Sequence, residues 1–87
     1  MVCYIRSSNI ESAIMGEEVG LLNIETGKYY ILDGIGKSIW LLLEKKICLD
    51  DLVESLVVEY DVEKNICKKD TEDWLSEMVL NKSIIGE

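Results

Sequence analysis

The segment from Lys28 to Leu43 constrains the fold of this 87-residue chain more than any other part of it. It begins with Lys28–Leu32, a run of aromatic and apolar residues that favours a β-strand. Asp33-Gly34 then breaks the strand, because both residue types are common in turns. The apolar residues that follow fall on one face of a helix: Ile35, Ile39, Leu42 and Leu43. A strand that leads directly into an amphipathic helix predicts a mixed α and β domain.

Two more strands are predicted before this segment. Met1–Arg6 alternates weakly and favours a first strand, whereas Ser7–Met15 is polar and is expected to be irregular. Glu18–Ile24 alternates more clearly, and we expect it to form a hairpin with Lys28–Leu32. Gly27 suits the connecting turn, since glycine accepts the positive φ value that such turns require.

Two more helices are predicted after this segment. The second is expected to follow Asp50 as its N-cap, and the third is expected to span Asp70–Lys82, with Asp70 as its cap. Asp61–Lys69 is polar and predicts a connection or a short wing strand, while Ile84 and Ile85 are expected to pack back on the body. The fold class is therefore α+β: a winged-helix-like domain over residues 1–87, with a three-stranded antiparallel sheet packed on three helices.

The cysteine pattern predicts neither zinc nor a cofactor. Cys3, Cys48 and Cys67 are widely spaced, and the chain has no His, whereas structural zinc sites usually have four Cys or His ligands. We expect all three cysteines to be free, small buried residues, in agreement with a reducing compartment. The N-terminus lacks the layout of a signal peptide, and no apolar run is long enough to span a membrane. These features predict a cytoplasmic protein.

The residue types also argue against catalysis. Without His, a Ser-His or Cys-His nucleophile pair is impossible. The carboxylate pairs Asp50-Asp51 and Glu72-Asp73 lie where helix starts favour negative charge, so capping is their expected role. The Gly-Lys-Ser that begins at Gly36 resembles the end of a phosphate-binding loop, but the pattern needs a glycine where Ile31 stands. We therefore predict that the protein is not an enzyme.

Charge separates the remaining possibilities. The net charge is −8, and residues 48–87 carry four basic and eleven acidic side chains. Such a surface repels nucleic-acid phosphates and attracts basic peptides, although acidic helices also simply keep a small domain soluble. The alternative function is a winged-helix DNA-binding transcription regulator. Its recognition helix would be Asp70–Lys82, which carries four acids and one lysine, so the charge argues against nucleic acid as a partner.

The strand Lys28–Leu32 offers another kind of binding surface. An edge strand has unpaired backbone groups to which a peptide can add as a new strand. Tyr29 and Tyr30 offer apolar surface with a polar tip, and Trp74 and Met78 are candidates for an opposite wall. The alternative is that Tyr30, Leu32, Leu75 and Met78 are core residues, which we favour for Leu32 and Leu75. Tyr29, Trp74 and Glu77 flank the apolar stripes and are expected at the surface.

The order of these motifs resembles that of the PqqD-like family of leader-peptide recognition domains. The stretches that carry the resemblance are GKYYILDGIGKSIWLLL, DDLVESLVVEYDV and DTEDWLSEMVLNKSII, which together extend to Ile85. The Ile39-Trp40 pair and the length of the chain are most similar to the discrete leader-binding proteins of lasso peptide biosynthesis. The family usually has Asn where this chain has Asp33, so the local charge differs.

The resemblance implies a function and a site. In the family, the leader of a precursor peptide binds as an added strand on the third strand, against the third helix. A separate cysteine-type leader peptidase then processes the precursor, and the recognition domain performs no chemistry. The implied peptide-binding residues are Lys28, Tyr29, Tyr30, Ile31, Leu32, Asp33, Asp73, Trp74, Glu77, Met78 and Asn81.

Overall fold

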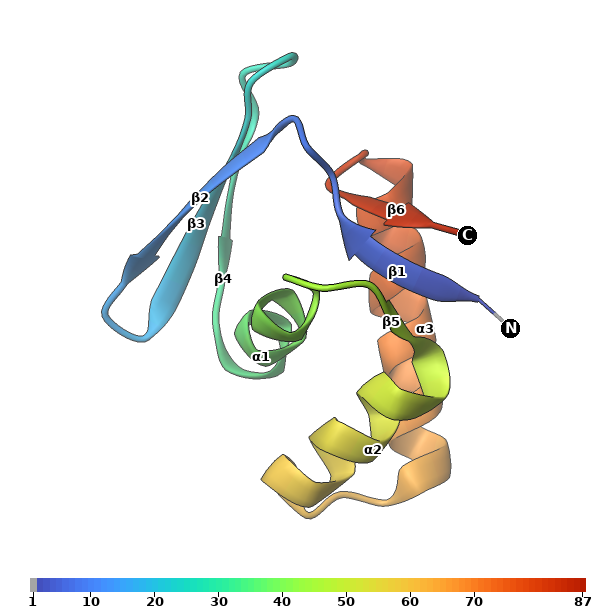
Figure 1. The fold of residues 1–87 in the computed structure, drawn as a ribbon. Coiled ribbons are helices and arrows are strands. Elements are labelled where there is room, and N and C mark those ends of the chain that lie inside the picture. Colours follow the sequence, from blue (N-terminus) through green and yellow to red (C-terminus); the bar gives the residue numbers. More distant parts are fainter. Residues whose placement is uncertain (1) are drawn as a thin grey trace.

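The computed structural model describes residues 2–87. Within them the chain forms six strands and three helices (Figure 1). In chain order these are β1 (Cys3–Arg6), β2 (Ile10–Met15), β3 (Glu18–Asn23), β4 (Tyr29–Leu32), α1 (Gly34–Leu42), β5 (Ile47–Cys48), α2 (Leu49–Tyr60), α3 (Lys64–Leu80) and β6 (Ile84–Gly86).

The strands form two antiparallel sheets rather than one. The first has the order β2-β3-β4, and the second has the order β5-β1-β6. Figure 1 shows the first sheet beside α1 and the second beside α3, with α2 below both. The predicted class is confirmed, since a three-stranded antiparallel sheet accompanies three helices. The prediction of which strands form this sheet was wrong in one respect. β1 belongs to the second sheet, and β2 takes the place expected for β1.

The irregular structure predicted for Ser7–Met15 is therefore wrong. Ile10–Met15 pairs with β3 along its whole length, from Ile10 opposite Asn23 to Met15 opposite Glu18. The strand was not evident because five of its six residues are exposed, so no buried face imposes an alternating pattern. Gly16, with a φ of 63°, turns the chain into β3.

The helix starts also differ from those predicted. The N-cap of α2 is Cys48, and Asp50 lies in its first turn. Asp70 is not a cap, because α3 already begins at Lys64, where the carboxylate of Glu63 accepts a hydrogen bond of 2.8 Å from the Ile66 N–H. The first half of α3 looked like a loop because its buried stripe includes Cys67 and Thr71 instead of large apolar residues. No helix within residues 2–87 is long and apolar enough to cross a membrane.

The core lies where α1 meets β3, α2 and α3. Trp40 in α1 is its largest fully buried side chain, and β3 contributes Val19 and Leu21 from one of its two alternating faces. Asn23 is buried on the same face, where its Oδ1 accepts hydrogen bonds from the backbone N–H groups of Glu25 and Thr26. The remaining fully buried apolar residues are Ile39, Leu43, Leu52, Val53, Leu56, Leu75 and Ile84.

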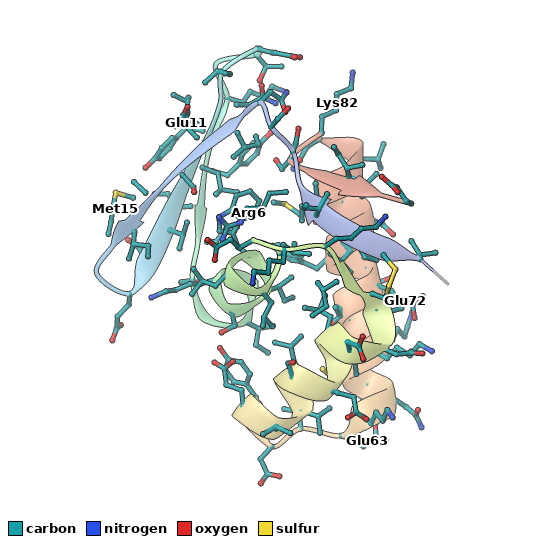
Figure 2. All side chains as sticks on the ribbon, in the orientation of Figure 1. Arg6, Glu11, Met15, Glu63, Glu72 and Lys82 are labelled. Carbon is teal, nitrogen blue, oxygen red and sulfur yellow. A yellow bond between two sulfur atoms is a disulfide. The ribbon has the colours of Figure 1, made fainter. Side chains whose placement is uncertain are left out.

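Arg6 connects the second sheet to this core. Its Nε and Nη2 atoms both donate hydrogen bonds to the carbonyl oxygen of Trp40, at 3.0 and 2.8 Å. The guanidinium also lies over the Trp40 ring, 4.7 Å from its centroid, in a cation–π arrangement. Burial lowers the pKa of Arg6, while nearby Glu44 raises it. In Figure 2 this side chain lies between the two sheets, above α1.

A disulfide joins β1 to β5. Cys3 and Cys48 are directly opposite in the antiparallel register and form this bond, whereas Cys67 is free and buried. The expectation of three free thiols is therefore wrong for two of them. The two cysteines are 45 residues apart in sequence, and only the pairing of the two strands brings them together.

We predict that Arg6→Ala lowers the free energy of unfolding by about 1–3 kcal/mol, because it removes both Arg6 hydrogen bonds to the Trp40 carbonyl and leaves only the one from the Leu43 N–H. Arg6→Lys should recover only part of this, since an ammonium lacks the forked geometry of a guanidinium. Urea denaturation measures both changes. Lys45→Ala is the control, because it removes one exposed positive charge. If Arg6→Ala and Lys45→Ala destabilise equally, the contact with Trp40 does not stabilise the fold.

Candidate functional site

The open edge of β4 is the first part of the candidate site. β4 pairs with β3 on one side only, and no other strand within residues 2–87 covers its second edge. Gly27, at a φ of 75°, forms the turn that the sequence predicted, and it holds β3 and β4 in register. A strand with one unpaired edge offers backbone donors and acceptors to a further strand.

The register shows which residues present those backbone groups. The N–H of Asn23 donates to the Lys28 carbonyl at 2.9 Å, and these two residues extend the β3–β4 ladder by one pair. Hydrogen-bonded and non-hydrogen-bonded pairs alternate in an antiparallel ladder. Tyr30 and Leu32 therefore bond to β3, and the backbone N–H and C=O groups of Tyr29 and Ile31 point to the open edge.

The β4 side chains alternate between surface and core, in agreement with the surface position expected for Tyr29 and the core position favoured for Leu32. Tyr29 and Ile31 are each 54% exposed, whereas Tyr30 and Leu32 are half-buried and pack against the core. The Tyr29 hydroxyl makes a weak hydrogen bond of 3.8 Å to the sulfur of Met15 on β2. At the ends of the strand, Lys28 and Asp33 are exposed. Asp33 is the N-cap of α1 by its backbone geometry, but its side chain makes no capping hydrogen bond.

The second group of predicted site residues lies on α3 and at its C-terminal end. Asp73 and Glu77 are exposed, and Asp73 forms an ion pair of 3.8 Å with Lys69. Trp74 is half-buried, whereas Met78 is only 6% exposed and belongs to the core. Asn81 is the C-cap residue. Its Nδ2 contacts the Met78 sulfur at 3.6 Å, and its Oδ1 accepts a hydrogen bond from the Ser83 N–H.

The two groups adjoin α1 from different sides. β4 runs into α1 through Asp33, and the Trp74 ring lies against Gly36, where an added Cβ would be 3.5 Å from Nε1. Figure 1 shows α1 between β4 and α3. Within residues 2–87, no hydrogen bond or ion pair joins a β4 residue to an α3 residue. The predicted residues of β4 therefore lie together, and so do those of α3. The two groups are connected through α1, which follows β4 in the chain and packs against Trp74 of α3.

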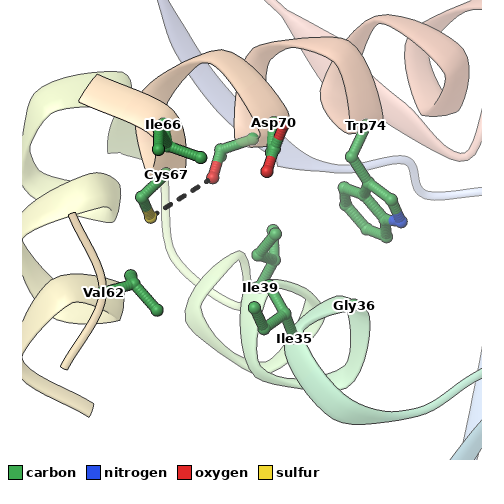
Figure 3. Close-up of a pocket in the computed structure, with 9 residues that line it drawn as sticks. Ile35, Gly36, Ile39, Val62, Ile66, Cys67, Asp70 and Trp74 are labelled. Atoms are coloured by element: carbon green, nitrogen blue, oxygen red, sulfur yellow. Dashed lines mark hydrogen bonds between the residues drawn. The ribbon is translucent and has the colours of Figure 1, made fainter. Parts of the chain in front are cut away.

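An apolar pocket that was not predicted from the sequence lies between α1 and α3. Its volume is about 290 Å³. Figure 3 shows Trp74 and Asp70 on one wall, Ile35 and Ile39 on the other, and Val62 at one end. One available signal was Ile66, an apolar residue in a polar stretch. The pocket is lined by Ile35, Gly36, Ile39, Val62, Ile66, Cys67, Asp70, Thr71 and Trp74.

The charges on α3 are more balanced than predicted. Because the helix begins at Lys64, it includes three lysines, which pair with Glu54, Asp50 and Asp73 at 3.5–3.8 Å. All these groups are exposed, so each pair stabilises little. In the second sheet, burial raises the pKa of Tyr4, and the negative charge of Glu72 adds to this effect. Among residues 2–87, no three His, Cys, Asp or Glu side chains group as a metal site.

Comparison with known proteins shows the family. The protein family described as Coenzyme PQQ synthesis protein D (PqqD) matches residues 18–83, which is most of the chain. The chain therefore belongs to the PqqD family, which confirms the resemblance seen in the sequence. No curated protein matches it significantly.

Two solved structures have the same fold. One is TbiB1 in complex with the TbiA(beta) leader peptide, which is 32% identical, with a TM-score of 0.85 over 92% of this chain and 93% of that one. The other is lasso peptide synthetase B1 complexed with the leader peptide. It is 21% identical, with a TM-score of 0.84 over 94% of this chain and 96% of that one, and it supports the fold alone.

We predict that Met78→Ala lowers the free energy of unfolding by about 2–5 kcal/mol, since it opens a cavity in the core. Glu77→Ala, one residue away on the exposed face, should change it by less than about 0.5 kcal/mol. Chemical denaturation of both variants measures the difference. Equal effects would contradict the placement of Met78 inside and Glu77 outside.

Proposed function

We propose that this protein recognises the leader of a ribosomally made precursor peptide by β-strand addition to β4, and that it performs no chemistry itself. The observation that carries the proposal is the open edge of β4, where the backbone groups of Tyr29 and Ile31 face outward in a chain of the PqqD family. The similar protein TbiB1 forms a complex with a leader peptide, which supports the same proposal.

Strand addition accounts for both affinity and selectivity. A peptide on this edge gains hydrogen bonds to the N–H and C=O groups of Tyr29 and Ile31, each worth about 0.5–1.5 kcal/mol net. Its alternate side chains then lie beside the exposed side chains of Tyr29 and Ile31 or beside half-buried Tyr30 and Leu32. The backbone hydrogen bonds can form with a peptide of any sequence, so the side-chain contacts would select the leader.

The residues on α3 complete the proposed site as an opposite wall. We assign Trp74 and Asn81 to direct contact with the peptide, because each is partly exposed. Glu77 adds exposed negative charge, which favours a leader with basic residues, whereas Asp73 is exposed but paired with Lys69. Met78 supports this wall from the core instead of touching the peptide, since it is almost fully buried.

The proposal also includes a partner and a location. A recognition domain without catalytic groups requires a separate enzyme, and we propose the cysteine-type leader peptidase of a lasso peptide pathway. We also propose that residues 1–87 form a single recognition domain and that it acts in the cytoplasm. The Cys3–Cys48 disulfide is at odds with a compartment that keeps most thiols reduced, so mass spectrometry after rapid alkylation in cells tests that location. Alkylation of both cysteines would support the cytoplasm, and an intact disulfide would argue against it.

We predict that the protein binds the leader segment of the precursor encoded beside its gene with a dissociation constant below about 100 μM, or more than about 5 kcal/mol of binding free energy. Titration calorimetry with the synthetic leader measures it, and a scrambled leader is the control. The absence of binding at ~100 μM would reject leader recognition.

We predict that Ile31→Pro abolishes this binding, because proline removes the N–H that Ile31 presents at the open edge. Ile14→Pro is a matched control. Ile14 is also an exposed isoleucine, and it lies on β2, at the other edge of the same sheet. The register places its N–H outward as well, since the N–H of Ile24 donates to the carbonyl of Asn9.

Both variants should fold, which circular dichroism checks, and only Ile31→Pro should lose binding in fluorescence polarisation. Loss of binding in Ile14→Pro alone would move the added strand to β2. Full binding by both variants would argue against strand addition at either edge of the sheet.

A further inference from the structure

We propose that the leader peptidase docks on the outer face of the first sheet, β2-β3-β4, through a basic surface with an apolar centre. The outer face is the side of this sheet opposite the buried side chains of Val19 and Leu21. Of the predicted site residues, the register places only Tyr29 and Ile31 on it. This inference rests on the proposed function, because it names the surface that would bring the bound leader to its enzyme.

The outer face is apolar and uncovered. Its apolar residues come from all three strands of the sheet: Ala13, Met15, Leu22, Tyr29 and Ile31. All five are exposed, so no other part of residues 2–87 covers them. Figure 2 shows Glu11 and Met15 on the side of the sheet away from α1. Contiguous apolar patches on a protein surface mark interaction sites, whereas single exposed apolar residues do not.

Gly20 allows a close approach at the centre of this face. Because it has no side chain, the Tyr29 side chain lies over it and its hydroxyl reaches the Met15 sulfur at 3.8 Å. A Cβ at Gly20 would displace the Tyr29 hydroxyl and the Met15 methyl group, which would be 2.8 Å away. The outer face is therefore nearly flat around Tyr29.

A shallow hollow of about 250 Å³ lies beside the Tyr29 ring, lined also by Ala13, Leu22 and Glu11. It combines an aromatic ring and aliphatic side chains with one carboxylate. An arginine or lysine fits this combination, because its stem packs on apolar surface and its charge is attracted by the ring and by Glu11. Arginine is also common among the residues that carry most of the binding energy of an interface.

The charge around this face fits a basic partner. Residues 7–27, which include β2, β3 and the turns at their ends, contain no Lys or Arg and four acids: Glu11, Glu17, Glu18 and Glu25. None of the ion pairs within residues 2–87 involves these acids. Lys37 reduces their charge at one end, where its Nζ donates to the Gly16 carbonyl. A second copy would bring the same acids and a net charge of −8, so repulsion disfavours it.

The outer face continues onto the bound leader. Tyr29 and Ile31 present their backbone groups to the open edge and their side chains to the outer face. Directly opposite residues of paired strands have their side chains on the same face. The leader residues opposite Tyr29 and Ile31 would therefore widen the outer face by one strand. A peptidase docked there contacts both chains, so leader binding strengthens docking and docking strengthens leader binding by the same factor.

Ala13→Arg tests this surface. Ala13 lines the hollow but lies on β2, two strands away from the open edge of β4. The probe is the purified leader peptidase encoded beside this gene, titrated by calorimetry against the full chain. Ala13→Arg should weaken peptidase binding by about tenfold or more and change leader binding by less than about twofold. A saturating amount of leader should strengthen peptidase binding to wild-type protein by about threefold or more.

Ile14→Arg is the matched control. It introduces the same residue at the next position of β2, where the side chain is exposed on the opposite face. It should change either affinity by less than about twofold.

Glu11→Lys is a second variant, which alters only an exposed charge and leaves the apolar residues in place. It should weaken peptidase binding by about fivefold at low salt, and by less at high salt, because salt screens exposed charges. Asp51→Lys, which reverses an exposed acid on α2, should have little effect. Circular dichroism checks that every variant is folded.

Equal peptidase binding by wild-type protein, Ala13→Arg and Glu11→Lys would overturn the docking surface and leave leader recognition intact. No binding of the peptidase to wild-type protein at ~100 μM would do the same. If wild-type protein does not bind the leader, the proposed function fails, and the peptidase titration then decides on the surface by itself. A wild-type dimer that Ala13→Arg dissociates, as measured by light scattering, would assign the outer face to a second copy and overturn the proposal.

Discussion

The burial of the Trp40 side chain fixes α1 in the core, and the positions of both sheets and of α3 follow from it. The Trp40 side chain is 1% exposed, and its carbonyl accepts two hydrogen bonds from Arg6 of β1. The Trp40 ring therefore packs in the core, while the Trp40 carbonyl connects α1 to the second sheet through Arg6. Because β4 leads directly into α1, fixing this helix also fixes where the open edge of β4 ends. It also forms one wall of the apolar pocket, whose other wall is α3.

The proposed site uses two elements of very different character. β4 contributes mainly backbone groups, whose direction follows from its register with β3. The α3 helix contributes side chains, and its buried stripe of Cys67, Thr71, Leu75 and Met78 decides which of them remain outside. A strand edge recognises any extended chain, whereas a charged helix face recognises particular side chains. In the proposed function, this combination selects one leader peptide.

Much of this arrangement was predictable from local patterns, and the errors have identifiable causes. The alternation of β3 and β4, the turn at Gly27 and the start of α1 follow from residue type and spacing, and all are confirmed. β2 was missed because a mostly exposed strand carries no apolar period. The first half of α3 was missed because small and polar residues occupy its buried positions. In both segments, pairing or packing with distant residues decides the structure.

Local patterns and the order of motifs were enough to predict the fold class, the hairpin with its aromatic strand, and the membership of the PqqD family that the family match confirmed. These properties depend on neighbouring residues and on the order of motifs. The tertiary structure alone decided which sheet β1 joins, that Cys3 bonds to Cys48, that Met78 is core, and that α1 and α3 enclose a pocket. Each of these depends on contacts between residues far apart in the chain, and no local pattern specifies such contacts.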